Sequence, residues 1–170
     1  MLSPKIVTES LDELQDNLCE ELGVDKLQIK TENIKEDAIL DIKNNCIILS
    51  EETAKDIVES KKAIIHEMRH QYQLYCIALD IEEEPMRKMW ALEIKHDIHK
   101  YDVEYMNLLY IEIDAYAYTK KFMKDKYDYN LKYSPEYEKI VNKYIKNNLK
   151  IWNSPFLPKL EQIAFLILKV

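Results

Sequence analysis

The chain has 170 residues, a length that suits one domain spanning residues 1–170. Hydrophobic residues make up 47 % and charged residues 32 %, a balance typical of globular rather than disordered chains. The net charge of −7 argues against a general nucleic-acid-binding protein, which usually presents a basic face. Gly23 is the only glycine, so the glycine-rich phosphate-binding loops of many nucleotide-binding enzymes are excluded.

The cysteines and the apolar segments bear on where the protein is found. Cys19, Cys46 and Cys76 form no CxxC pair, so neither a disulfide framework nor a cysteine zinc ribbon is predicted. The first ten residues lack the apolar core of a secretion signal. The longest apolar run, Ile163–Leu168, is too short to span a bilayer. We therefore expect a cytoplasmic protein that does not bind membranes.

The first predicted element is an amphipathic helix from about Glu9 to Leu22. Leucines at positions 11, 14, 18 and 22 recur every three or four residues and therefore share one helical face. Gly23 follows directly, where a C-terminal cap residue is expected.

Three short strands are predicted next, because the apolar period shortens to two residues. Leu27 and Ile29 alternate with polar residues, and Ala38–Ile42 and Cys46–Leu49 form two further strand-like segments. Lys43–Asn45 lies between the last two and suits a tight turn, since asparagine tolerates positive φ. We expect a small antiparallel sheet.

The rest of the chain has a helical pattern almost to its end. Ser50, followed by two glutamates, suits a helix N-cap, and Ser60 suits the start of a helix running to about Leu79. Further helices are predicted to begin at Pro85 (with Trp90 and Ile94 buried), at about Val103 (running to Met123), at Pro135 and at Pro155. The predicted fold class is therefore α+β: a small sheet followed by packed helices.

The segment His66-Glu67-Met68-Arg69-His70 contains the pattern HExxH. In a helix, residues four apart lie one turn apart on the same face, so His66 and His70 can direct their imidazoles at one point. A zinc ion about 2.0–2.1 Å from each nitrogen would complete that arrangement. Ile64 and Ile65 precede the motif and an apolar stripe follows it, which favours a helix. The pattern predicts a Zn²⁺ site.

Glu67 is the candidate catalytic residue. It is displaced by about 100° around the helix from His66, which places its carboxylate beside the metal. There it can take a proton from a zinc-bound water, whose pKa the metal lowers, and pass the proton to the leaving amine. Zinc binding alone does not require a glutamate at this position, so its presence favours catalysis.

A catalytic zinc ion needs a third protein ligand and an open fourth position. Downstream, Glu112 and Asp114 lie in the segment 110–118, and His96 and His99 form a second histidine pair. We favour Glu112 over Asp114, because its longer side chain reaches across a helix pair and Ala115 lies on its face. The histidine pair remains an alternative source of the ligand.

These two blocks resemble a known family. HExxH followed by a second helix with ExxA is similar to the gluzincin branch of zinc peptidases, and more narrowly to the ImmA/IrrE group and small predicted metallopeptidases of bacterial mobile elements. The resemblance covers about residues 66–75 and 110–118, together with the strand-rich stretch before them. It implies a zincin-like fold, Glu112 as the third ligand, and close helix packing at Ala115. It also implies a regulatory protease that cuts a specific repressor.

The sequence departs from this pattern at the position four residues after Glu112. Thermolysin-like enzymes have an aspartate there, whereas this chain has Tyr116. Asp114 is an alternative partner for a ligand histidine, although it lies about 200° around the helix from Glu112. For Arg69, within the motif, we expect an ion pair on the outer face of the helix.

Candidates for stabilising the oxyanion that forms on a substrate carbonyl are numerous. They are His96 and His99, which could equally be a solvated pair, and Tyr101, Tyr105, Tyr110 and Tyr116. The acidic run Glu82–Glu84 suits a solvated turn. In a zincin-like fold, an edge strand of the sheet would bind an extended substrate by β-augmentation, and either Ala38–Ile42 or Cys46–Leu49 could be that strand. The alternative is that these two strands form an ordinary hairpin.

The sequence supports three functional hypotheses. The first is a zinc metallopeptidase that hydrolyses a peptide bond in a protein or peptide, such as a regulatory protein, with Glu67 as general base and acid. The second is a catalytically silent interaction or regulatory module of the same fold. The third is a helical protein with a fortuitous HExxH, in which His66, His70 and Glu112 do not converge.

Overall fold

The computed structural model of the chain describes residues 4–78, 85–95 and 109–152. The elements are α1 (Pro4–Thr8), α2 (Leu11–Leu22), β1 (Gln28–Glu32), β2 (Ala38–Asp41), β3 (Cys46–Ser50), the short 3₁₀ helix η1 (Thr53–Lys55), α3 (Ile57–Ala78), α4 (Pro85–Lys95), α6 (Tyr110–Tyr127) and α7 (Pro135–Trp152). The class is α+β, with a small sheet followed by packed helices, as the sequence predicts. Some predictions fall on residues outside the described ranges: Leu79, Glu82–Glu84, His96, His99, Tyr101, Tyr105, Pro155 and the run 163–168.

Helix α2 forms where the leucine spacing predicts it, with its ends set by local chemistry. Ser10 is the N-cap, and its hydroxyl accepts a hydrogen bond from the backbone of Glu13, whose carboxylate accepts one from the backbone N–H of Ser10. Gly23 ends the helix at φ 66°, a left-handed conformation that costs glycine little. Leu14, Leu18 and Leu22 are buried in the core.

The sheet is mixed rather than antiparallel, which corrects the prediction. β2 and β3 form the expected antiparallel hairpin, whose turn holds Asn45 at φ 52°. β1, however, pairs with β3 in parallel, so the strand order is β1-β3-β2. β3 carries the most apolar segment, and four of its five residues are buried, so the central place in the sheet suits it. β2 is left as an edge strand.

The start of the long helix also differs from the prediction. Ser50 does not begin an α-helix: it ends β3, and its hydroxyl accepts a hydrogen bond from the backbone N–H of Thr53, the first residue of the 3₁₀ helix η1. Asp56 then caps α3 by accepting hydrogen bonds from the N–H groups of Val58 and Glu59. Ser60 lies inside α3, where its hydroxyl donates to the carbonyl of Thr53.

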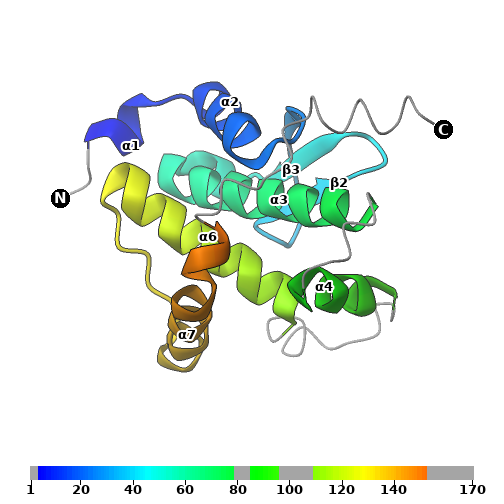
Figure 1. Ribbon diagram of the computed structural model, residues 1–170. Helices are drawn as coiled ribbons and strands as arrows, with labels where there is room; N and C mark the ends of the chain where they lie inside the picture. The colour runs from blue at the N-terminus through cyan, green and yellow to red at the C-terminus, as the bar shows by residue number, and fades with distance from the viewer. Residues whose placement is uncertain (1–3, 79–84, 96–108, 153–170) are drawn as a thin grey trace.

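Helix α3 is the centre of the molecule (Figure 1). α2 lies on one side of it, the sheet behind it, and α6 and α4 on the other side. Ile64, Ile65 and Met68 are completely buried along this helix. Because neighbours surround α3, polar residues such as Lys61 and Gln73 are also buried.

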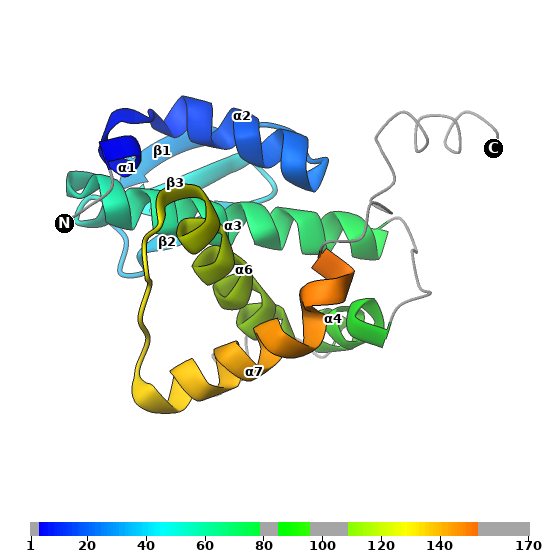
Figure 2. The same cartoon turned by 60° about the vertical axis from the view of Figure 1, so that its left-hand side comes forward.

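Helix α6 crosses α3 and carries α7 on its far side (Figure 2). Between α6 and α7 lies a second apolar cluster, formed by Ile113, Ala117, Val141 and Tyr144. α4 begins at Pro85 as predicted, and its Trp90 is buried in the main core. In the described part of the chain, no helix is both long and apolar enough to cross a bilayer.

Candidate metal centre

His66 and His70 lie one turn apart on α3, as the HExxH spacing predicts. Their Nε2 atoms face each other at 3.0 Å, and the two rings meet edge to face. Two nitrogen lone pairs at this distance repel each other unless a proton or a cation lies between them. The helix alone therefore directs two donor atoms at one point.

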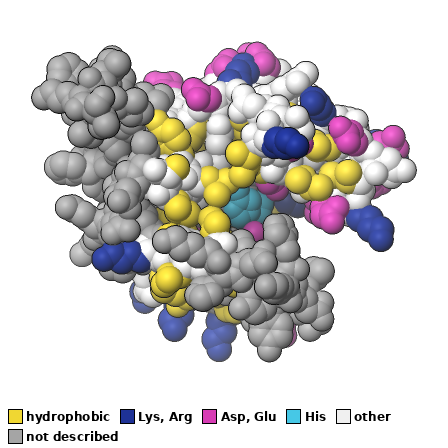
Figure 3. Space-filling model, turned by 90° about the vertical axis from the view of Figure 1, so that its right-hand side faces the viewer, with side chains coloured by type: hydrophobic (Ala, Val, Ile, Leu, Met, Phe, Trp, Pro, Cys, Tyr) yellow, Lys and Arg dark blue, Asp and Glu magenta, His cyan; other side chains and the backbone are white. Residues whose placement is uncertain are grey.

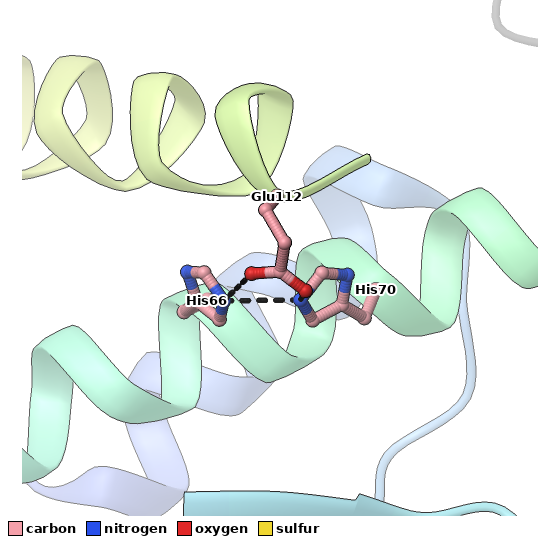
Figure 4. A group of neighbouring side chains, drawn as sticks. All are labelled: His66, His70 and Glu112. Carbon is pink, nitrogen blue, oxygen red and sulfur yellow. Dashed lines mark hydrogen bonds and ion pairs between the residues drawn. The ribbon is translucent and has the colours of Figure 1, made fainter. Parts of the chain in front are cut away.

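Glu112 comes from the first turn of α6 and points down between the two histidines (Figure 4). Its Oε2 lies 3.3 Å from Nε2 of His66, and its Oε1 lies 3.3 Å from Nε2 of His70. All three ligand atoms lie within 4.8 Å of one another, so this group could hold a metal ion. This convergence contradicts the hypothesis of a fortuitous motif.

The spacing of the donor atoms suits a tetrahedral ion. Ligand atoms at about 2.0–2.1 Å from a tetrahedral zinc ion lie roughly 3.3–3.4 Å apart. In the structure the two Nε2 atoms are 3.0 Å apart, and each lies 3.3 Å from a different oxygen of the Glu112 carboxylate, distances close to those around such an ion. Two imidazoles and one carboxylate are also a ligand set found in catalytic zinc sites. The residues present therefore fit the zinc ion that the sequence predicts.

Glu112 is positioned by the start of α6, which α4 caps. The N-cap residue Leu109 provides no side-chain hydrogen bond. Instead, the carboxylate of Glu93 on α4 accepts hydrogen bonds from the backbone N–H groups of Tyr110, at 2.8 Å, and Ile111, at 2.9 Å. Ala115, one turn after Glu112, is completely buried, which suits a close approach of α6 to α3.

Asp114, the alternative third ligand that the sequence left open, is not part of the group that could hold a metal ion. Its carboxylate is buried and accepts hydrogen bonds from Arg69, with Nε at 2.7 Å, and from the Tyr144 hydroxyl at 3.1 Å. The expected ion pair of Arg69 on the outer face of the helix is therefore wrong. The Arg69 side chain is 6 % exposed, and its guanidinium lies against the rings of Tyr72 and Tyr118.

Gln73 connects the buried pair to the metal-binding group. Its Oε1 lies 2.7 Å from Nδ1 of His70. Its Nε2 donates to Asp114 Oδ2 at 2.7 Å and to the backbone carbonyl of Ile111 at 2.9 Å. The sequence offered Asp114 as a direct partner of a ligand histidine, whereas in the structure the Gln73 amide lies between Asp114 and His70.

The charges of the group act on one another. Burial lowers the pKa of His70, but the hydrogen bond and the charge of Glu112 outweigh it and raise that pKa to about 9, with a smaller contribution from Glu67. Burial raises the pKa of Glu112, but the hydrogen bonds with His66 and His70 outweigh this and hold it well below its usual range. Glu112 thus favours a positive charge on His70.

Glu67 and Tyr116 lie beside the three donors. Glu67 is buried, and it is close enough to His70 and Tyr116 for its charge to raise the pKa of both. The Tyr116 ring packs on His66 with 4.5 Å between centroids. Burial, followed by the charges of Glu112, Asp37 and Glu67, raises the pKa of Tyr116 to about 12. Of the candidates for oxyanion stabilisation, Tyr116 lies at the group, whereas Tyr110 is 46 % exposed.

The metal-binding group is open to solvent on one face. The side chains of His66, His70 and Glu112 are 14 %, 15 % and 19 % exposed, so a small part of each reaches the surface. Figure 3 shows histidine atoms at the bottom of a recess, with hydrophobic surface around them and acidic atoms beside them. His66 and His70 are the histidines among the described residues, so this recess leads to the candidate metal centre.

The chain was compared with family models, curated proteins and solved structures. No family model matches it, and neither the curated proteins nor the solved structures contain a significant match. The function is therefore inferred from the chemistry and geometry of His66, His70 and Glu112.

Sequence reasoning missed the two residues that support the donors, Gln73 and Glu93. Gln73 lies three residues after His70, a helical spacing that brings two side chains together, so the signal was present. Glu93 gave no local signal, because it caps a helix that begins 17 residues later in the chain.

Proposed function

We propose that this protein is a zinc-dependent metallopeptidase that hydrolyses a peptide bond in a protein substrate. The observation that carries the proposal is the convergence of His66, His70 and Glu112, from two helices, on one point where they could hold a metal ion. These three residues would be the zinc ligands. Glu67 in the same motif adds a buried carboxylate beside them, which a purely structural zinc site does not need.

The residues of this chain divide the reaction between them. A zinc ion held by the three ligands would supply a Lewis acid that activates water and polarises the substrate carbonyl. Glu67 takes a proton from the attacking water while the oxygen of that water bonds to the carbonyl carbon. Glu67 then delivers the proton to the amide nitrogen as the carbon–nitrogen bond breaks. Tyr116, whose ring packs on His66, would donate a hydrogen bond from its hydroxyl to the carbonyl oxygen as charge develops there.

The edge strand β2 offers a place for an extended substrate. β2 pairs only with β3 in the described sheet, so its other edge has unpaired backbone groups that can bind a peptide. Asp37 directly precedes β2 and is close enough to Tyr116 for its charge to raise the pKa of that tyrosine. The start of this strand therefore lies near Tyr116, whose ring packs on His66. A regulatory protein is the first substrate class to test, given the resemblance to the ImmA/IrrE group.

Metal content is the first test of the proposal. Protein purified without tags or chelators is expected to contain about one zinc ion per chain, in line with a three-ligand site. His66→Ala and Glu112→Ala should both lose the zinc, whereas Glu67→Gln should keep it. The exposed Glu36→Ala, which has no part in the site, is the control. A parent protein without zinc, even after the metal is added back, would sink the proposal.

Peptide-bond cleavage is the second test. Zinc-loaded protein and the Glu67→Gln variant are incubated with an unfolded protein such as casein in ¹⁸O-labelled water, and the products are analysed by mass spectrometry. Cleavage by the parent alone, with one ¹⁸O atom in each new carboxyl terminus, is the expected result. Zinc binding with no cleavage of casein or of candidate regulatory proteins would favour the catalytically silent module instead.

A further inference from the structure

Gln73 forms three hydrogen bonds through its side-chain amide. Its Nε2 lies 2.7 Å from Asp114 Oδ2 and 2.9 Å from the Ile111 carbonyl oxygen, and its Oε1 lies 2.7 Å from Nδ1 of His70. The side chain is completely buried in the α3–α6 interface. A role for Gln73 in metal binding rests on the proposed zinc site.

The surroundings of Gln73 determine which way its amide points. Asp114 Oδ2 and the Ile111 carbonyl can only accept hydrogen bonds, so both must face the NH₂ group of Gln73. The reversed amide would place an oxygen against two other oxygens in a buried interface. The amide oxygen Oε1 therefore faces His70.

An amide oxygen also accepts and never donates. For the 2.7 Å contact to be a hydrogen bond, Nδ1 of His70 must carry a hydrogen and donate it to Oε1. In the neutral imidazole the lone pair is then on Nε2, the atom that faces His66 and Glu112. We propose that Gln73 is a positioning residue that fixes the tautomer and ring orientation of His70, so that Nε2 is directed at the metal.

The amide is fixed in turn by the buried ion pair. Asp114 accepts hydrogen bonds from Arg69 Nε at 2.7 Å and from Tyr144 at 3.1 Å, so its carboxylate is fixed from α3 and α7 as well as by Gln73. Ligand histidines commonly donate their second nitrogen directly to a carboxylate or a carbonyl. Here the carboxylate acts through an amide, and its charge stays balanced by the buried guanidinium of Arg69.

The role of Gln73 is tested by Gln73→Met, which keeps a similar volume and removes the hydrogen bonds. Gln71→Met is the matched control, because Gln71 is on the same helix and bonds only the Asp25 carbonyl, at 3.1 Å, among the contacts described. Zinc affinity is measured by competition with a chelator. Loss of the hydrogen-bond partner of a metal ligand typically weakens metal affinity by about 10–100-fold. We expect this loss of zinc affinity for Gln73→Met and not for Gln71→Met.

A second measurement, made on the parent protein, separates a positioning role from a structural one. In ¹⁵N-labelled, zinc-loaded parent protein, long-range ¹H–¹⁵N spectra should show His70 with zinc on Nε2 and a slowly exchanging hydrogen on Nδ1. That hydrogen should exchange fast in Gln73→Met and remain slow in Gln71→Met. Zinc on Nδ1, or affinity and exchange unchanged in Gln73→Met, would overturn the inference while leaving the zinc site intact. Absence of zinc from the parent would overturn both.

Discussion

At the scale of single residues, the ion pair between Arg69 and Asp114 is linked to the candidate metal centre through the Gln73 amide. Both side chains are almost fully buried, and Arg69 lies against the rings of Tyr72 and Tyr118. Burial alone would lower the pKa of Arg69, but the charge of Asp114 outweighs it, so the arginine stays charged. A buried pair of this kind is costly to break, because either charge left alone lies in a poorly solvated interior.

Arg69→Met is therefore expected to lower the free energy of unfolding of the metal-free protein by about 3–5 kcal/mol. Urea denaturation followed by circular dichroism measures this. The control is Lys124→Met, which removes the solvent-exposed ion pair with Asp128, where water and salt screen the charges; little change is expected. Equal, small losses in the two variants would contradict a stabilising role for the buried pair.

At the scale of elements, the start of α6 depends on α4. The carboxylate of Glu93 accepts hydrogen bonds from the first two backbone N–H groups of α6, and Glu112 occupies the next position along that helix. A cap supplied by another helix couples the packing of α4 to the position of a proposed zinc ligand. The negative charge of Glu93 is also favourable there, because it lies at the positive end of the α6 helix dipole.

We expect Glu93→Ala to cost about 0.5–2 kcal/mol of stability and, in addition, to weaken zinc binding. Glu13→Ala is the matched control, because Glu13 belongs to the capping box of α2, which holds no proposed ligand. The two variants should lose similar stability in thermal denaturation, while only Glu93→Ala should lose zinc affinity in a chelator competition. Equal zinc affinity in both would show that the cap has no influence on Glu112.

The elements also show which features a sequence alone can predict. The HExxH spacing and the Gly23 cap of α2 depend on residues within about one turn, so they follow from helical geometry. The parallel pairing of β1 with β3 depends on contacts far apart in the chain, which alternation within a strand does not encode. The prediction for Arg69 was wrong for a related reason: a helical pattern does not say which sides of α3 the neighbouring elements cover. The start at Ser60 was wrong because Asp56 offers an earlier cap.

At the scale of the whole molecule, Glu9 joins the N-terminal helices to the two helices that carry the donors. Its carboxylate forms ion pairs with Lys61 of α3 at 3.2 Å and with Lys126 of α6 at 2.7 Å, and it accepts a hydrogen bond from Tyr127. The side chain is only 10 % exposed. Burial raises the pKa of Glu9, but the hydrogen bonds from Lys126, Tyr127 and Lys61 outweigh it and hold the pKa below its ordinary value of 4.5.

The lowered pKa gives the sign of a pH dependence. Because the folded protein binds this proton more weakly than the unfolded chain, the stabilisation by Glu9 is fully present above about pH 4.5. It is lost as the pH falls through the lower, folded-state pKa. Glu9→Gln should therefore lower the free energy of unfolding at pH 7 by about 1.5–3 kcal/mol, the contribution of hydrogen bonds to a charged group.

The difference between parent and Glu9→Gln should shrink as the pH is lowered below about 4.5, since the parent then also loses the charge. Urea denaturation of both proteins from pH 7 to pH 3 measures this difference, and Glu36→Gln, at an exposed site, controls for general acid effects. A difference that stays constant over this range would mean that the charge of Glu9 does not stabilise the fold. If the difference shrinks as expected, one carboxylate links α3 and α6 far along α6 from Glu112, and so helps to keep the crossing that brings the three donors together.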